Sequence, residues 1–218
     1  GRNGIYSAKK LTIGTATIGN AQGGIGKTTG GNGIHSDSDL DISGKAFIQN
    51  AKGGDSWVRG GDGIHSTGIL TIKDDATIQK AQGGTSKSGG HGIYSKNNLA
   101  ISQSAKINNA TGGDSTNDTG NGGGSGIFGK TMKIAVGIIN QAIGGSSTGT
   151  DENDTGGSGI SASEDLTISG WIQNATGGSA KDGKAGDGIH SGKSFITSGG
   201  RIASATGGNG GAGIGGRK

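Results

Sequence analysis

The 218-residue chain has no cysteine and no proline, and aromatic residues make up only 3% of it. Without cysteine the chain cannot carry a disulfide framework, and this absence is compatible with an exported protein that avoids misoxidation. No apolar run reaches the length of a membrane-spanning helix. The scarcity of aromatic residues also disfavours a bladed β-propeller, which needs longer strands and more aromatics in each repeat.

Glycine, by contrast, provides 53 of the 218 residues. Such a composition is typical of disordered chains when the glycines have no period and apolar residues are too sparse to form a core. In this chain the glycines recur in register with a repeated apolar pattern. The sequence therefore predicts a folded repeat protein.

The period is set by eight Gly-Ile dipeptides, with successive spacings of 29, 30, 29, 34, 33, 29 and 25 residues. They begin at Gly4, Gly33, Gly63, Gly92, Gly126, Gly159, Gly188 and Gly213. Repeats of this length, with insertions confined to one position, indicate a solenoid. We predict one β-solenoid over residues 1–218, with repeats at 3–31, 32–61, 62–90, 91–124, 125–157, 158–186 and 187–211 and a partial repeat at 212–218.

Each repeat contains three short segments with the properties of strands. Leu-x-Ile segments such as Leu11 to Ile13 alternate apolar and mostly polar residues, which is the period of a half-buried strand. A second strand is predicted to end at an isoleucine three residues before an alanine, as at Ile18, and a third to run through Gly-Ile. Joined at glycine-rich corners, these strands predict an all-β fold, a right-handed parallel β-helix of about seven to eight turns. Each turn would hold 25 to 34 residues.

Stacking of the turns would align equivalent residues into columns. One predicted column contains Ile5, Ile34, Ile64, Ile93, Ile127, Ile160 and Ile189, and a second contains Leu11, Leu40, Leu70, Leu99, Met132 and Leu166. A third set, Ala21, Ala51, Ala81, Ala110, Ala142, Ala175 and Ala205, is expected to mark a corner too tight for a larger side chain.

Asparagine recurs directly before these alanines, at Asn20, Asn50, Asn109 and Asn174. Asparagine tolerates the left-handed backbone of a corner, and its amide can bond to the same position one turn away, so we predict an asparagine ladder. The alternative is glycosylation, because Asn109, Asn174, Asn117 and Asn153 each begin an Asn-x-Thr motif.

The residue after Gly-Ile forms another predicted stripe, which includes Tyr6, His35, His65, Tyr94, Phe128 and His190. One hypothesis is that flat rings in this stripe stack on a polysaccharide, which makes these six residues candidate carbohydrate-binding residues. The preferred interpretation is that the rings pack on one another and protect one edge of the fold.

The repeated phrases GGNGIHS (30–36), GGDGIHS (60–66) and GDGIHS (186–191) resemble repeats of bacterial cell-surface parallel β-helix proteins. They are similar to the carbohydrate-binding β-helix domains of Gram-positive surface proteins. The closing ATGGNGGAGIGG (205–216) also resembles glycine-rich repeats of autotransporter passengers. The resemblance covers nearly the whole chain and implies a shared scaffold with a variable ligand.

The sequence gives little support for a catalytic or metal-binding site. Acidic residues are scattered over turns and loops, whereas a glycosidase needs two carboxyl groups at a set separation, so we predict no catalytic residue and no enzyme activity. Among the histidines of the stripe only His35 and His65 fall on adjacent turns, so no metal site is predicted. The cluster from Asp151 to Asp154 leaves calcium open, with a solvated loop preferred, and no other cofactor is expected.

These observations favour a non-enzymatic extracellular or cell-surface element, either a stalk or a fibre subunit that stacks head to tail. Neither end of the repeat array carries a polar cap, so we expect either a fragment or a subunit whose ends stack on copies of itself or on other surface proteins. An acidic-polysaccharide-binding module is the alternative, and a polysaccharide lyase or hydrolase is the least favoured. Lysines are spread over all repeats, so neither nucleic-acid binding nor membrane insertion is expected.

Overall fold

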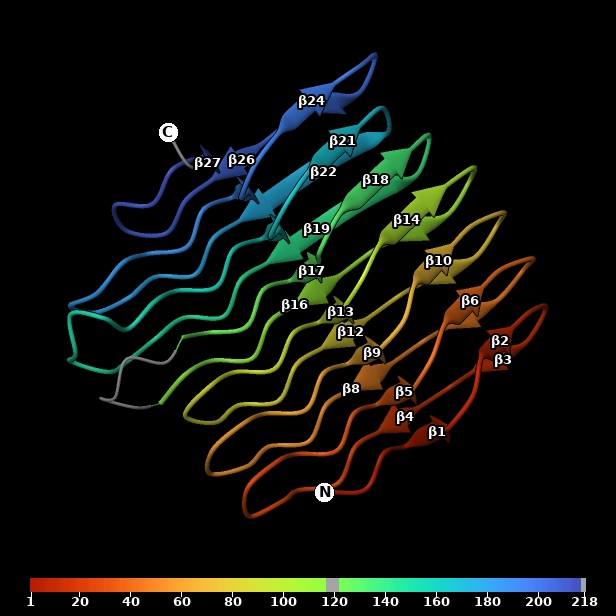
Figure 1. Cartoon of the computed structure of the whole chain (residues 1–218), viewed down its shortest axis with the longest axis horizontal. Coiled ribbons are helices and arrows are strands. Elements are labelled where there is room, and N and C mark those ends of the chain that lie inside the picture. Colours follow the sequence, from red (N-terminus) through yellow and green to blue (C-terminus); the bar gives the residue numbers. More distant parts are fainter. Residues whose placement is uncertain (117–121, 217–218) are drawn as a thin grey trace.

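The computed structural model describes residues 1–116 and 122–216. In these residues the chain winds into a stack of about seven turns in which every sheet is parallel. Each turn is long and flat, with the strands at one end and a glycine-rich loop at the other (Figure 1). The predicted all-β parallel solenoid is therefore confirmed.

Sheet A is built from the Gly-Ile segments and has eight strands. It contains β1 (Ile5–Ser7), β5 (Ile34–Ser36), β9 (Ile64–Ser66), β13 (Ile93–Ser95), β17 (Ile127–Gly129), β20 (Ile160–Ala162), β23 (Ile189–Ser191) and β27 (Ile214–Gly216). The register aligns each isoleucine with the isoleucine of the next turn, as predicted.

Sheet B is built from the Leu-x-Ile segments and has seven strands. It contains β2 (Leu11–Ile13), β6 (Leu40–Ile42), β10 (Leu70–Ile72), β14 (Leu99–Ser102), β18 (Met132–Ala135), β21 (Leu166–Ile168) and β24 (Phe195–Thr197). The predicted leucine column is present, and Phe195 continues it beyond Leu166.

Sheet C has twelve strands in two columns that merge in the middle of the stack. The first column has β3 (Thr17–Ile18), β7 (Phe47–Ile48), β11 (Thr77–Ile78) and β15 (Lys106–Ile107). The second has β4 (Ala21–Gln22), β8 (Ala51–Lys52), β12 (Ala81–Gln82) and β16 (Ala110–Thr111). Both continue in β19 (Ile138–Ile143) and β22 (Trp171–Thr176), then separate into β25 (Arg201–Ile202) and β26 (Ala205–Thr206).

The core between the sheets is a narrow stack of isoleucine, leucine and alanine. Ile34, Leu70, Ile101 and Ile172 are among many core side chains with at most 1% exposure. Because each turn supplies only a few apolar side chains, each depends on the turns above and below for burial.

The alanine column does not lie at a corner, so that prediction is wrong. Ala51 lies inside strand β8 and Ala175 inside β22, both fully buried. The backbone of this column packs tightly against the segment that leads into sheet A, because a Cβ atom at Gly33, directly before β5, would lie 2.7 Å from the carbonyl oxygen of Ala21.

The left-handed corner lies instead between sheets B and C. Gly44, Asp74, Gln103 and Val136 have φ angles of 62°, 60°, 58° and 63°. Asp74 Oδ2 accepts the Gly44 N–H at 2.9 Å, and Gln103 Oε1 accepts the Asp74 N–H at the same distance. The corners at Gly44, Asp74 and Gln103 are thus bonded in series by side chains.

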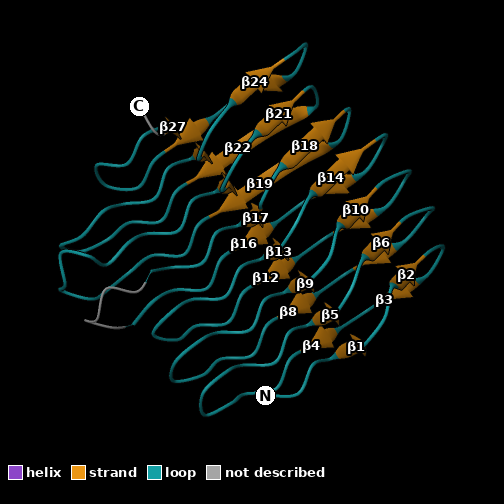
Figure 2. Ribbon diagram, viewed as in Figure 1, coloured by secondary structure: helices purple, strands orange, loops and turns teal. Residues whose placement is uncertain are grey.

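The glycine-rich segments are not corners either, but flat two-legged extensions of the coil (Figure 2). Gly31 N–H donates to Gly24 O across the two legs at 2.9 Å, and Gly54 N–H donates to Gly31 O in the preceding turn at 2.8 Å. This zigzag of backbone bonds continues through Gly61, Gly84, Gly90, Gly113, Gly124, Gly145, Gly157, Gly178, Gly186 and Gly208. A Cβ atom at Gly53 would lie 1.9 Å from Gly61 O, so the legs pack backbone against backbone and only glycine fits.

Candidate functional site

The predicted ring stripe forms along the outer side of sheet A. Five of its rings stack in order, with centroid separations of 5.6, 4.6, 4.7 and 5.3 Å along Tyr6, His35, His65, Tyr94 and Phe128. The spacing follows from the sheet, because parallel strands place equivalent residues one strand apart. His91, which was not predicted to join, stacks on both Tyr94 and Phe128.

His190 is not part of this stack. Phe128 pairs with Ser161 in the next turn, and Ser161 pairs with His190, so the serine interrupts the rings. His190 Nδ1 lies 2.8 Å from Asp187 Oδ2 instead.

Hydrogen bonds fix the orientation of the rings in the first two turns. Asn32 Nδ2 lies 2.6 Å from His35 Nδ1, and since an amide nitrogen only donates, the imidazole accepts there and carries its proton on Nε2. His35 Nε2 then donates to Asp37 Oδ1 at 2.6 Å, and the Tyr6 hydroxyl donates to Asp37 Oδ2. The hydrogen bonds from Tyr6 and His35 hold the pKa of Asp37 below its usual range, and the same bond to Asp37 raises the pKa of Tyr6.

In the next turn, the buried Asp62 side chain accepts hydrogen bonds from two histidines. Its Oδ2 accepts from His65 Nδ1 at 2.6 Å, and its Oδ1 accepts the His91 N–H at 2.6 Å. Burial alone would raise the pKa of Asp62, but the bond from His65 and the positive potential of His91 and His65 lower it overall. Burial between the rings lowers the pKa of His91.

A ladder of side-chain acceptors runs beside the rings. Asn3 Oδ1 accepts the Asn32 N–H, Asn32 Oδ1 accepts the Asp62 N–H, and Asp62 and His91 continue the series. Sequence reasoning missed this ladder, although its signal is visible as Asn, Asp or His directly before the glycine of five of the eight Gly-Ile pairs.

The stacked geometry limits what the stripe can bind. The faces of His35, His65 and Tyr94 are covered by neighbouring rings, and only their edges point outward, since these residues are half-buried. Tyr6, at the first end of the stack, has 56% of its surface exposed. This geometry supports ring-on-ring packing, and sugar binding by the stripe stays a prediction.

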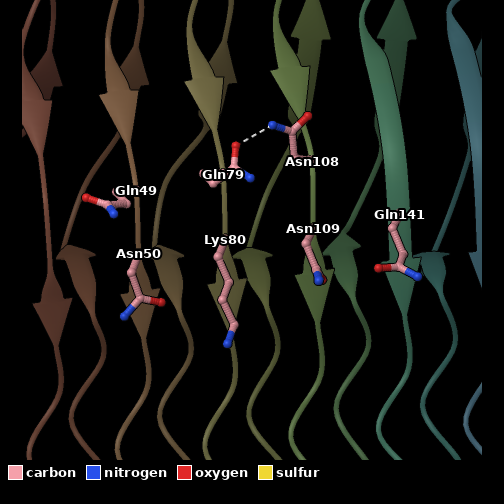
Figure 3. A pocket seen from close by; sticks show the side chains of 7 residues that line it. All are labelled: Gln49, Asn50, Gln79, Lys80, Asn108, Asn109 and Gln141. Carbon is pink, nitrogen blue, oxygen red and sulfur yellow. Dashed lines mark hydrogen bonds between the residues drawn. The ribbon is translucent and has the colours of Figure 1, made fainter.

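An amide-rich trough crosses several turns of sheet C. It is a shallow open hollow of about 590 Å³. It is lined by Gln49, Asn50, Gln79, Lys80, Asn108, Asn109 and Gln141 (Figure 3). Asn108 Nδ2 donates to Gln79 Oε1 at 2.5 Å, and Asn140 Nδ2 donates to Asn108 Oδ1 at 2.7 Å, so this column bonds three successive turns.

The predicted asparagine ladder is present only where asparagines occupy adjacent turns. Asn50 Nδ2 donates to Asn20 Oδ1 at 2.7 Å, whereas Asn109 and Asn174 accept from Thr111 and Thr176 two residues further on. The expected left-handed backbone is wrong, because Asn20, Asn50, Asn109 and Asn174 are absent from the positive-φ residues among those described. Asn20, Asn50 and Asn109 lie between the two columns of sheet C, directly after a bend, and Asn174 lies within the continuous strand β22.

Glycosylation stays a prediction for Asn109, Asn153 and Asn174, and Asn117 lies outside the described residues. No group of three or more His, Asp or Glu side chains suited to a metal ion occurs within residues 1–116 and 122–216. In the Asp151 to Asp154 loop, Asn153 Nδ2 donates to Asp151 Oδ1 at 2.9 Å, while Asp154 is fully buried. Calcium binding there stays a prediction.

Aspartates that are scattered in the sequence share one structural role, which is to bond one turn to the next. Asp39, Asp55, Asp62, Asp74, Asp114, Asp165 and Asp187 each accept a backbone N–H from an adjacent turn. Bonds from an amide to a carboxylate are stronger than those between neutral groups. These acids therefore join turns together.

No family model, curated protein or solved structure matches the chain. Within the described residues there is no helix long and apolar enough to cross a membrane. The fold and its bonds therefore provide the grounds for the functional proposals.

Proposed function

We propose that the chain is a non-enzymatic structural element of an extracellular surface, a stiff stalk or fibre segment that is extended by stacking further turns. The observation that carries this proposal is the set of aspartates that bond one turn to the next. Together with three parallel sheets and the glycine zigzag, they make every level of the coil depend on its neighbours.

The two end faces support extension of the stack. Strands β1 to β4 at one end and β24 to β27 at the other have an unpaired edge. Ile5, Leu11 and Ile18 are half-buried at the first face, and Ile214 is 49% exposed at the last, although their counterparts inside the stack are buried. Open edges and apolar columns pair with a further turn of the same type, whether it belongs to a longer chain or to another copy.

The charge at the two ends of the stack makes stacking between copies depend on salt concentration. Residues 1–31 contain Arg2, Lys9, Lys10 and Lys27 and no acidic residue, and residues 187–218 contain four basic residues and one acidic residue. Like charges on two meeting faces repel, and salt screens this repulsion. Stacking between copies is therefore expected to strengthen with ionic strength.

Sedimentation velocity tests the proposal. Wild-type protein is expected to associate with rising concentration at about 0.5 M salt and much less at about 0.05 M salt. Ile214→Lys places a charge on the end face and should abolish association, whereas Val136→Lys places the same charge at a more exposed corner position and should not. A monomer at every concentration and salt level would contradict stacking between copies.

Carbohydrate binding is the second candidate function, and the amide trough is the observation that favours it. Amide groups both donate to and accept from sugar hydroxyls, and the trough follows the stack axis. A screen against soluble polysaccharides, with Gln79→Ala/Asn108→Ala compared with Tyr94→Ala, separates the trough from the ring stripe. Loss of binding only in Tyr94→Ala would favour the stripe, and no binding by wild-type protein would reject this function.

A further inference from the structure

Exposed apolar side chains gather at the ends of the first two glycine-rich extensions. Ile25 is 81% exposed, Trp57 76% and Val58 48%. The backbone holds them together, because the Trp57 N–H donates to Lys27 O at 3.2 Å and Gly26 bridges Ser56 of the next turn. We call Ile25, Trp57 and Val58 the apolar tip.

Cationic side chains surround the apolar tip. Lys27, Arg59 and Lys87 are all exposed, and they come from three successive turns joined by backbone bonds. Asp55 is the only acidic residue in segments 23–31, 53–61 and 83–90. One of its oxygens already accepts the Thr85 N–H at 2.8 Å. The tip thus combines apolar surface with net positive charge.

The shape of the tip determines what it can contact. The extensions end in narrow bends that project from the side of the stack (Figure 1). Neither the amide trough nor the hollow at Gly1, Arg2, Asn3 and Tyr6 includes these residues. Small ligands bind in concave sites, whereas a projecting row of apolar side chains fits a broad, soft surface.

We propose that the apolar tip and its cations form a peripheral docking surface for an anionic lipid bilayer. Tryptophan favours the boundary between headgroups and acyl chains, and lysine and arginine are attracted to anionic headgroups. A soluble polyanion would engage the cations but would leave Ile25, Trp57 and Val58 in water. The bilayer satisfies both parts of the surface at once, and this proposal does not depend on stacking between copies.

The two tryptophans of the chain allow a direct test. Trp171 lies on sheet C with the Arg201 guanidinium carbon 5.7 Å from its ring centre, away from the tip in sequence and strand position. In a Trp171→Phe variant, Trp57 is the sole tryptophan and its emission can be excited selectively over that of the tyrosines. The test mixes this variant with phosphatidylcholine vesicles that contain or lack phosphatidylserine, and measures emission and co-sedimentation.

We expect a blue shift of Trp57 emission and co-sedimentation with the anionic vesicles, both weakened by salt. Each neutralised cation should weaken vesicle binding roughly fivefold. Lys27→Gln/Arg59→Gln and Trp57→Ala should therefore each reduce binding of the wild-type chain. Lys45→Gln/Lys96→Gln and Trp171→Ala change the same residue types elsewhere and should leave it unchanged.

Absence of binding to anionic vesicles would overturn the proposal. So would binding that Trp57→Ala leaves intact, because the apolar part would then be unused. Binding to heparin but not to vesicles would assign the tip to a soluble polyanion and reject the bilayer. Trp57-dependent self-association without vesicle binding would assign it to a second copy, which Ile214→Lys distinguishes from end-to-end stacking.

Discussion

The amide nitrogen of Gly54 donates a hydrogen bond of 2.8 Å to the carbonyl oxygen of Gly31, which lies on the opposite leg of the extension in the preceding turn. The bond is possible only because neither residue has a side chain on the facing side: a Cβ atom at Gly54 would lie 2.2 Å from Gly24 O. Glycine therefore acts here as a packing residue, which allows two layers of backbone to approach closely.

Replacement of a packed glycine should be costly. A Cβ atom at Gly84 would lie 2.1 Å from Gly54 O, so Gly84→Ala must force the extensions apart. We expect a loss of about 3 kcal/mol in the free energy of unfolding, measured by denaturant titration. Gly14→Ala is the control, because nothing lies within 4 Å of its Cβ position. Equal stability of the two variants would contradict backbone packing in the extensions.

Val136 occupies an unfavourable backbone conformation. It is a β-branched residue at φ 63°, and 71% of its surface is exposed, so its side chain contributes little packing in return. Asparagine adopts this conformation more readily, so Val136→Asn should stabilise the chain by about 1 kcal/mol. Val58→Asn, at an exposed position without positive φ, should change stability by less than about 0.5 kcal/mol. A thermal melt that shows Val136→Asn to be destabilised would refute the explanation.

Much of this architecture could be predicted from the sequence, because isoleucine and leucine recur with the periods that strands require. The Ile34 and Leu40 columns formed as predicted. The glycine zigzag could not be predicted, because Gly-Gly pairs are equally typical of turns, and only the facing leg shows why glycine is needed. The left-handed corner was placed at Asn50 instead of Asp74, since both residue types tolerate that backbone.

The site residues were predicted less completely. Stacking of Tyr6 to Phe128 follows directly from the repeat, but His91 entered from a neighbouring position that the repeat alone does not mark as aromatic. The amide column similarly lies at Asn108, one residue before the predicted Asn109. Neighbouring residues of an extended segment point to opposite sides, so a shift of one residue changes which side chain can bond to the next turn. Strand register decides which of the two residues it is.

The amide column should contribute measurably to stability. Asn108 bonds to both Gln79 and Asn140, so Asn108→Ala removes two bonds between turns. We expect a loss of about 1 kcal/mol in the free energy of unfolding. Asn109→Ala is matched in type and exposure but removes only the bond from Thr111, and should cost less. The reverse order in a denaturant titration would place the ladder at Asn109.

Acidification should destabilise the ring stripe. Because burial lowers the pKa of His91 below 6.5, the unfolded chain binds more protons near pH 6, so stability falls as the pH drops below about 6.5. The pKa of Asp62 also lies below its ordinary 3.8, so its contribution is present above about pH 4 and is lost on further acidification.

Melting temperatures between pH 7.5 and pH 5 test the contribution of His91. His91→Asn removes the titrating group but keeps an acceptor for the Ser125 N–H, so the variant should show a shallower loss on acidification than wild-type protein. His190→Asn, outside the continuous ring stack, controls for the general effect of replacing a histidine. Parallel pH profiles for wild-type and His91→Asn proteins would exclude His91 as the cause.

The central claim is that this coil is an extensible structural element, and electron microscopy of the purified chain at rising protein concentration tests it most directly. At about 0.5 M salt, where charge repulsion between end faces is screened, we predict filaments of uniform width that shorten or disappear in Ile214→Lys. Single particles at all concentrations, indistinguishable between wild-type and Ile214→Lys proteins, would contradict it.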